Sequence, residues 1–320
     1  MAEGFGPSEP GRFWRSLAAR FRSAPEIYGL ALAIVVFFGA SFALSWLRAL
    51  EFQTTTWDLG ILQQALWSTA HGRPFYESAD LETGGYQSLL QIHSAFLLYL
   101  LVPVYAAWPY PTTLFAVQSA VVASAAIPLF LLGRHVTGSP RLGLVAALAF
   151  LGWMPTLAST LYDVHIEALL PLETFSFTYL WARGRYGWGF AVGFVAFLSM
   201  ELAPVLLFFV GLFFLLPARL ELDRLRERFR RAIADPKVLA GVGFLVSCVA
   251  AYASLLYLRE HYLIQALGFH SLSTGGSGYV IGATPVELGL RASNLSIGFG
   301  TKMTNWILLL ALLGFVPLLA

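Results

Sequence analysis

The chain has 320 residues, of which 58% are hydrophobic and only 12% are charged. Ordinary soluble domains carry roughly 25% charged residues, so this composition excludes a water-soluble protein. Several apolar runs are long enough to cross a hydrocarbon layer of about 30 Å, and the sequence therefore predicts an all-α polytopic integral membrane protein. The net charge of +2 is uninformative in such a protein, where the positions of Lys and Arg along the chain matter instead, and no nucleic-acid partner is expected.

The first apolar run, residues 27–49, follows a basic N-terminus at residues 1–26. This terminus contains the arginines Arg12, Arg15, Arg20 and Arg22. The run is longer than the apolar core of a signal peptide and no convincing cleavage site follows it, so we expect a retained first helix. Because Lys and Arg accumulate on the cytoplasmic side of membrane proteins, we expect a cytoplasmic N-terminus and a transmembrane domain at residues 27–320.

Three further basic blocks predict the path of the chain through the membrane. They lie at residues 134–141, 183–185 and 219–231, and each is expected to face the cytoplasm. Residues 113–132 would then run inward and residues 142–157 outward.

Residues 94–108 are the one conflict in this path, because both of their ends would lie outside. A helix of this length would measure about 22 Å, which is short for a crossing, and Pro103 favours a break. We therefore expect a re-entrant or surface-lying segment within a first outer loop, residues 50–112. If the segment crossed instead, every later segment would be inverted.

The apolar stretch at residues 187–217 is too long for one crossing, since it would measure about 46 Å as a helix. Glu201 lies at its centre, and Pro204 is tolerated in the first turn of a helix but not in its interior. The sequence therefore predicts two short helices, a hairpin whose turn carries Glu201 to the outer side.

The remaining segments are a cytoplasmic loop at residues 218–237, a crossing at 238–258 and an outer loop at 259–301 that contains the flexible sequence STGGSGYVIG, with Gly275 and Gly278. Cys248, the one cysteine, lies in the crossing and is expected to be a packing residue. The sequence stops inside an apolar run, so we expect the protein to be truncated at its C-terminus.

In this topology, polar and ionisable side chains gather on the outer side. They are Asp58, Gln63, Gln64, His71, His93, Asp163, His165, Glu167 and Glu201. Ionisable groups at a membrane are energetically costly and usually have a partner or a function. This convergence is the main functional signal in the sequence.

Each of these groups also has a purely structural interpretation. Asp58 stands where it could be the N-cap of an interfacial helix, and Glu201 could pair with an arginine. On a helix Asp163 and Glu167 would share a face while His165 points away, which favours a carboxylate pair over a three-ligand zinc site. The aromatic residues Trp57, Trp67, Phe75 and Tyr76 fit a belt at the headgroup level.

Several motifs resemble a bacterial membrane-protein family catalogued as domain of unknown function 2079. They are WDLGILQQALWSTAHGRPFYES, the downstream His93, YDVHIEAL and LSMELAP, within residues 53–217. Asp58, His93, Asp163, His165, Glu167 and Glu201 match the family pattern. Gln63, Ile92, Met200 and Leu202 stand where members commonly carry charged residues, which argues against a metal site that needs several acids.

More distantly, the layout resembles the membrane-embedded glycosyltransferases of the C superfamily. This resemblance implies a polyprenyl-phosphate-linked sugar donor and membrane lipid as partners, at the outer face of the cytoplasmic membrane. It implies that Asp58 is the catalytic base, or that it acts through a divalent cation for which Asp58 and Asp163 are candidate ligands. The implied substrate-binding residues are Gln64, Arg73, His93, Asp163, His165, Glu167 and Glu201.

Two other functions fit the same residues. In a transporter or flippase, Glu201 and the acids of the YDVHIEAL motif would line a path for protons or a polar solute. In a non-catalytic scaffold, the loss of the charged residues that other family members carry at positions such as Gln63 and Ile92 would not impair function. The sequence does not identify the sugar, the acceptor or the oligomeric state.

Overall fold

The computed structural model describes residues 24–54, 56–79, 88–215 and 235–258, all within the first of two compact units, Met1–Ser271. The second unit, Leu272–Ala320, lies outside the described residues, as do the basic N-terminus, most of the predicted cytoplasmic loop at 218–237 and the predicted outer loop at 259–301. The described residues form helices and no strand.

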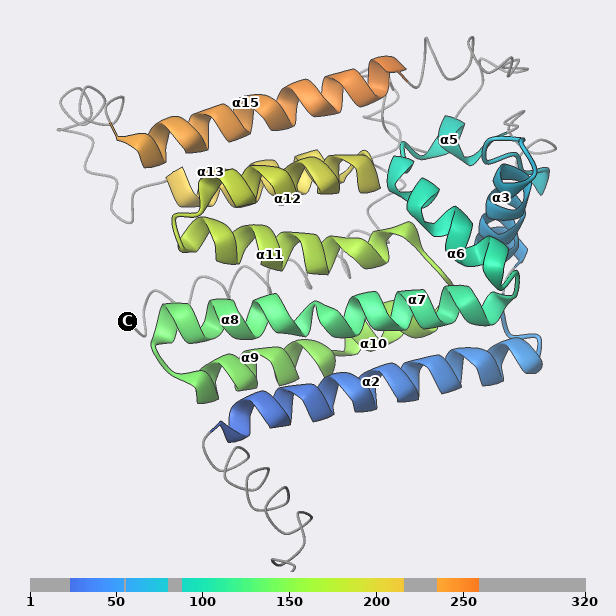
Figure 1. Cartoon of the computed structure of the whole chain (residues 1–320), viewed down its shortest axis with the longest axis horizontal. Helices are drawn as coiled ribbons and strands as arrows, with labels where there is room; N and C mark the ends of the chain where they lie inside the picture. The colour runs from blue at the N-terminus through green and yellow to red at the C-terminus, as the bar shows by residue number, and fades with distance from the viewer. Residues whose placement is uncertain (1–23, 55, 80–87, 216–234, 259–320) are drawn as a thin grey trace, which may run out of the picture. The chain divides into compact units, whose positions relative to one another are not determined.

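The helices follow one another in this order: α2 (Pro25–Leu50), η1 (Thr56–Gly60), α3 (Ile61–Ala70), α5 (Leu89–Ile92), η2 (Phe96–Leu100), α6 (Leu101–Ala107), α7 (Pro111–Ser124), α8 (Ala126–Thr137), α9 (Pro140–Leu151), α10 (Met154–Leu161), η3 (Ile166–Leu169), α11 (Leu170–Ala182), α12 (Tyr186–Ser199), α13 (Ala203–Leu215) and α15 (Pro236–Tyr257). Their arrangement is shown in Figure 1.

Among the described residues, three helical segments are long and apolar enough to cross a membrane: α2, the continuous pair α7 and α8, and α15. Each begins with a proline at its first position, where the missing N–H costs nothing because no intrahelical partner exists there. These segments confirm the all-α polytopic class and the helices predicted at residues 27–49, 113–132 and 238–258.

The predicted helix at residues 142–157 is broken. Helix α9 ends at Leu151, and α10 starts at Met154 with an axis turned by 46°. Pro155 explains the position of the break, because proline disfavours a helical conformation in the residue before it and is tolerated only in the first turn. The two helices together could still form a fourth span.

The hairpin predicted around Glu201 is confirmed. Helix α12 ends where Met200 adopts an extended conformation, and α13 begins at Ala203 with Pro204 in its first turn. The pair packs on α11 and α15 around Phe177 and Phe244, whose rings stack 4.4 Å apart. Cys248 is free and buried in this core, as expected of a packing residue.

The segment at residues 50–112 forms short helices that pack into a core of their own. Leu62 and Leu66 of α3 contact Phe75, and Leu114 extends this core to α7. The stretch Phe96–Ala107, which combines η2 and α6, belongs to the shorter apolar helices rather than to the candidate spans. Its length therefore agrees with the prediction that residues 94–108 do not make a full crossing.

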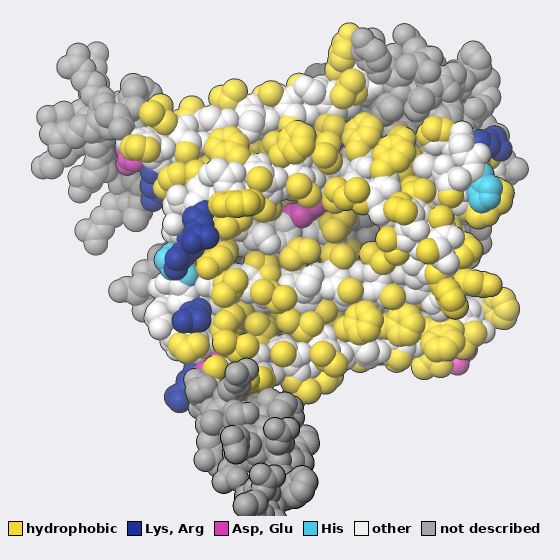
Figure 2. All heavy atoms as spheres, in the orientation of Figure 1, with side chains coloured by type: hydrophobic (Ala, Val, Ile, Leu, Met, Phe, Trp, Pro, Cys, Tyr) yellow, Lys and Arg dark blue, Asp and Glu magenta, His cyan; other side chains and the backbone are white. Residues whose placement is uncertain are grey.

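Most of the Lys and Arg side chains visible in Figure 2 lie at one end of the helices, and a smaller basic group lies at the opposite end. His135, in the last turn of α8, has its Nε2 atom 3.2 Å from the carbonyl of Ala182 at the end of α11, and Arg183 follows directly. Arg141 at the start of α9 pairs with Glu26 of α2 at 3.5 Å. The loops that follow α2 and α10 lie at the opposite end and carry most of the predicted site residues.

Candidate functional site

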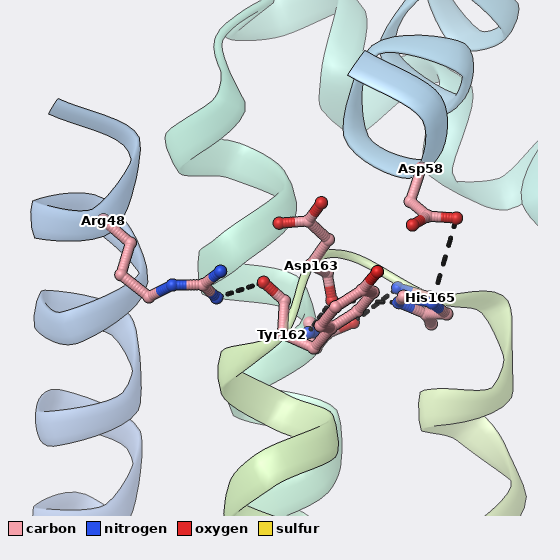
Figure 3. A network of polar contacts seen from close by, with 6 residues as sticks. Arg48, Asp58, Tyr162, Asp163 and His165 are labelled. Atoms are coloured by element: carbon pink, nitrogen blue, oxygen red, sulfur yellow. Dashed lines mark hydrogen bonds and ion pairs between the residues drawn. The ribbon is translucent and has the colours of Figure 1, made fainter. Parts of the chain in front are cut away.

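Asp58 lies in the π-helical turn η1, which continues directly into α3. The N-cap position of α3 is Gly60, with no side-chain cap, so the interpretation of Asp58 as an N-cap is wrong. The carboxylate of Asp58 instead faces His165, with Oδ1 3.9 Å from Nε2 (Figure 3). Both side chains are about one-third exposed, at 31% and 34%, so a substrate can reach the pair.

Gln118, a buried residue of α7, fixes the loop that carries His165. Its Nε2 atom donates hydrogen bonds to the carbonyls of Thr160 (3.0 Å) and Asp163 (2.8 Å). Its Oε1 atom accepts the backbone N–H of His165 at 2.7 Å. One amide side chain therefore satisfies three backbone groups of a segment that leaves the regular helix, where such groups would otherwise be buried without partners.

The tautomer of His165 follows from its second contact. The Nδ1 atom lies 3.1 Å from the carbonyl oxygen of Asp163. A carbonyl can only accept a hydrogen bond, so Nδ1 carries a proton. The other ring nitrogen, Nε2, is the one that faces Asp58 (Figure 3).

Arg48, at the end of α2, supports the same loop from the other side. Its guanidinium group donates to the carbonyls of Tyr162 and, at 2.8 Å, of Gln53. The ring of Tyr162 lies 5.4 Å from that of His165. Sequence analysis missed Arg48 and Gln118, although a polar side chain inside an apolar helix such as α7 is a signal that could have pointed to Gln118.

A second acid–imidazole pair joins the α12–α13 turn to residues 88–100. The Nδ1 atom of His93 lies 3.2 Å from Oε1 of Glu201, and the N–H of Ser94 donates to Oε2 at 2.9 Å. The alternative that Glu201 pairs with an arginine is therefore wrong. Glu201 is 2% exposed, so this pair has the geometry of a buried structural contact.

The environment of Glu201 stabilises its charged form. Burial by itself raises the pKa of this carboxyl group, but the hydrogen bond and positive charge of His93 and the N–H of Ser94 outweigh the burial, so the pKa of Glu201 lies below the usual value for glutamate. Glu201 lies in a turn outside the candidate spans.

Asp163 and Glu167 do not share a helix face, because η3 begins only at Ile166 and His165 is extended. Asp163 is 3% exposed whereas Glu167 is exposed. Within the part of the chain that the structure describes, no group of three His, Cys, Asp or Glu side chains could hold a metal ion.

Gln64 and Arg73 make contacts within residues 56–79. Gln64 accepts the N–H of Ser78 at 3.1 Å and contacts its hydroxyl group, and the guanidinium of Arg73 lies 3.6 Å from the centre of the Tyr76 ring. Trp57 and Trp67 are half exposed, as a headgroup belt requires, but Phe75 is fully buried and does not belong to it.

An apolar pocket of about 310 Å³ adjoins His165. It lies between η2, α6, α7 and η3, and its lining is formed by aliphatic side chains, such as Leu62, Leu101 and Ile166, together with Gln118 and His165. Its volume equals that of roughly ten water molecules at about 30 Å³ each, but nearly all of the lining lacks hydrogen-bonding groups. Such a pocket favours an apolar occupant over water.

A family model described as "Predicted membrane protein (DUF2079)" matches residues 48–320, which include the whole candidate site. No curated protein and no solved structure matches the chain. The family description states a membrane location and no activity, so an activity has to be argued from the site.

Proposed function

The chain belongs to the DUF2079 family of predicted membrane proteins, and from its site we propose that it is a glycosyltransferase that takes a sugar from a polyprenyl phosphate carrier. The observation that carries this proposal is that His165 lines the apolar pocket and lies 3.9 Å from Asp58. A lipid-linked sugar has an apolar polyprenyl chain, which the pocket would hold, and a charged phosphate, which His165 would bind.

The spacing of the pair suits two different oxygen atoms. The distance of 3.9 Å between Oδ1 and Nε2 is longer than a hydrogen bond. Each group can therefore form its own hydrogen bond, of about 2.8 Å, to a separate oxygen. In the proposed reaction these are the hydroxyl group of the acceptor at Asp58 and an oxygen of the donor phosphate at His165.

The proposed step is a single displacement at the anomeric carbon. Asp58 accepts the proton of the acceptor hydroxyl, whose oxygen forms a bond to the anomeric carbon. The bond from that carbon to the phosphate oxygen breaks, and its electron pair leaves with the phosphate. His165, protonated at Nε2, donates a hydrogen bond to the phosphate and stabilises the charge that grows there.

A divalent cation is compatible with this site but would depend on the substrate. Asp58 would be its protein ligand, and phosphate oxygens and water would supply the others, as is usual for Mg²⁺. Asp163, the second candidate ligand, is a buried residue of the loop, at 3% exposed.

The charges at the two ends of the helices support an external site. Arg134, Arg141, Arg183 and Arg185 lie at the end opposite to the Asp58–His165 pair. Because Lys and Arg favour the cytoplasmic side, the pair would face outward, where lipid-linked sugars are used as donors by the glycosyltransferases that the layout resembles.

Lipid binding is tested by native mass spectrometry of the purified full chain with an added polyprenyl phosphate. We expect the wild type to retain this lipid in preference to ordinary phospholipid, and His165→Ala to retain it less. His135→Ala is the matched control, because His135 lies at the other end of the helices. Equal retention of both lipids by the wild type would contradict the proposal.

Catalysis is tested with a polyprenyl-linked sugar once binding is established. We expect Asp58→Asn to lose transfer while it still binds the lipid, because the amide cannot accept the proton. Transfer at the wild-type rate would remove Asp58 from the mechanism. Uptake of a labelled solute into vesicles without any transfer would instead favour the transporter.

A further inference from the structure

Glu173 is a buried acid that the proposed transfer reaction does not use. It lies in the first turn of α11 and is 6% exposed. An ionisable side chain surrounded by apolar helices is energetically costly unless a partner or a proton compensates for its charge.

Ser199, at the end of α12, contacts Glu173, and its geometry identifies the hydrogen in this contact. The Oγ atom lies 2.8 Å from the carbonyl of Ala196 and 3.0 Å from Oε2 of Glu173. The hydroxyl group has one hydrogen, and the carbonyl can only accept. If the hydroxyl hydrogen bonds to the nearer carbonyl, the contact with Oε2 needs a hydrogen from the carboxyl group itself.

The surroundings of Oε1, the other carboxyl oxygen of Glu173, also favour the protonated acid. Oε1 is buried and has no hydrogen-bond partner among the described residues. A buried carboxylate oxygen without a partner is far more costly than the carbonyl oxygen of a neutral acid. The protonated acid therefore satisfies both oxygens better than the carboxylate does.

The basic groups on the elements that pack against α11 lie far from Glu173. His135 and Arg134 of α8 lie beside the last turn of α11, about 13 Å along the helix axis from its first turn. Lys237 is the second residue of α15. It lies seven residues before Phe244, the residue of α15 that stacks on Phe177 of α11. The other titratable groups on α11 and on the described elements beside it, with the residues that flank them, are His165, Glu167, Tyr179, Arg183, Arg185, Tyr186, the Glu201–His93 pair, Asp235, Cys248, Tyr252 and Tyr257.

We propose that Glu173 and Ser199 form a proton-binding site inside the helical bundle. In this site Glu173 keeps its proton at neutral pH, and its O–H donates a hydrogen bond to Oγ of Ser199. The ligand of this site is a proton, and the site is independent of the sugar-transfer chemistry. Because packing against the end of α12 keeps Glu173 out of water, and burial disfavours its charged form, the site retains its proton only while the end of α12 stays packed on α11. Loss of the proton is therefore coupled to movement of the α12–α13 turn.

The first test is labelling of the full chain at pH 7 with a membrane-soluble carbodiimide, followed by peptide mapping. The O–H of a carboxylic acid adds across one C=N bond: the carboxyl oxygen bonds to the central carbon, the proton passes to nitrogen, and the acyl group then migrates to nitrogen. We expect the peptide with Glu173 to gain the mass of one carbodiimide. Glu201, whose charged form is stabilised, should stay unmodified. An unmodified Glu173 would contradict the proposal.

The second test does not depend on reagent access. The infrared difference between wild type and Glu173→Gln at pH 7 should contain the C=O band of a carboxylic acid, shifted in D₂O. Carboxylate bands in its place would overturn the proposal. If Glu173→Gln does not fold, Ser199→Ala serves instead, because loss of the hydrogen bond should move the same band to higher frequency, and an unchanged band would count against the site.

Discussion

Gln118 connects a buried helix to the loop that carries His165, and its amide group makes three contacts with that loop. Gln118→Leu keeps a similar volume but leaves the carbonyl of Thr160 and the N–H of His165 without the amide group, while the carbonyl of Asp163 keeps only its contact with Nδ1 of His165. Each such group costs about 1–3 kcal/mol when it stays buried. We expect a lower melting temperature in detergent and weaker retention of polyprenyl phosphate, measured on the same preparation.

The matched control for this substitution is Gln53→Leu. The side chain of Gln53 is exposed and donates a hydrogen bond to the exposed Glu51 at 2.8 Å. This variant should melt and bind lipid as the wild type does. If Gln118→Leu behaved like the control, the loop would keep its conformation without the amide group.

Glu201 predicts a pH dependence of stability. Because its pKa is lower in the folded protein, the Glu201 contacts contribute their full stability above the ordinary glutamate value of about 4.3, and this contribution is lost as the pH falls through the lowered folded value. Glu201→Gln should therefore reduce the melting temperature at pH 6 but have little effect near pH 3. A charged hydrogen bond of this kind contributes about 1.5–3 kcal/mol.

Thermal unfolding of both proteins between pH 3 and pH 7 checks this expectation, with Glu51→Gln as the control on an exposed acid. A difference between wild type and Glu201→Gln that does not change with pH would mean that the charge of Glu201 contributes nothing.

Among single residues, the sequence drew attention to the polar groups but did not predict their contacts. Asp58, His93, His165 and Glu201 stood out because charges beside apolar helices are rare. Their pairing was not predicted, since His93 and Glu201 are separated by 108 residues and no local pattern links them. The N-cap interpretation of Asp58 failed because the helix begins one turn earlier than the apolar periodicity suggests.

Among the helices, the contact between α8 and α9 depends on Gly133 of α8 and Gly143 of α9. A Cβ atom on Gly143 would lie 2.6 Å from the carbonyl oxygen of Phe130 and 3.0 Å from the backbone nitrogen of Arg134. Backbone atoms cannot move aside, so Gly143→Ala should force the helices apart. We expect a loss of stability of about 1–3 kcal/mol, measured as a lower melting temperature.

Gly39→Ala provides a control in α2, where an added Cβ would meet nothing within 4 Å. This change should be neutral or slightly stabilising, since alanine favours a helix by about 0.5–1 kcal/mol relative to glycine. Similar losses in both variants would show that the effect is not specific to the α8–α9 contact.

The existence of most long helices was predictable from apolar length alone, whereas their breaks depended on particular prolines. Pro204 was recognised because Glu201 beside it made a continuous helix implausible. Pro155 was not, since the apolar run around it is short enough for one crossing. Small elements such as η1 and η3 follow from tertiary contacts, which sequence periodicity does not report.

For the molecule as a whole, the accumulation of arginines at the end of the helices opposite to the Asp58–His165 pair predicts the orientation in the membrane. In a Cys248→Ala background, Gln53→Cys lies at the end with the candidate site and Thr137→Cys at the basic end. A membrane-impermeant maleimide added to intact cells should label the first and reach the second only after permeabilisation. The reverse pattern would place the Asp58–His165 pair in the cytoplasm and contradict an external site.

Both ends of helix α2 form contacts with segments that are synthesised much later. Glu26 near its start pairs with Arg141, and Arg48 near its end donates to Tyr162, which follows it by 114 residues. At about 5–20 residues per second, the ribosome needs roughly 6–23 seconds to reach that partner. During synthesis the first helix therefore stays in the lipid or the insertion machinery without the contacts of Glu26 to Arg141 and of Arg48 to Tyr162 until the α9–α10 segment is made. A chain terminated before Tyr162 would leave α2 inserted but unassembled, and so exposed to membrane quality control.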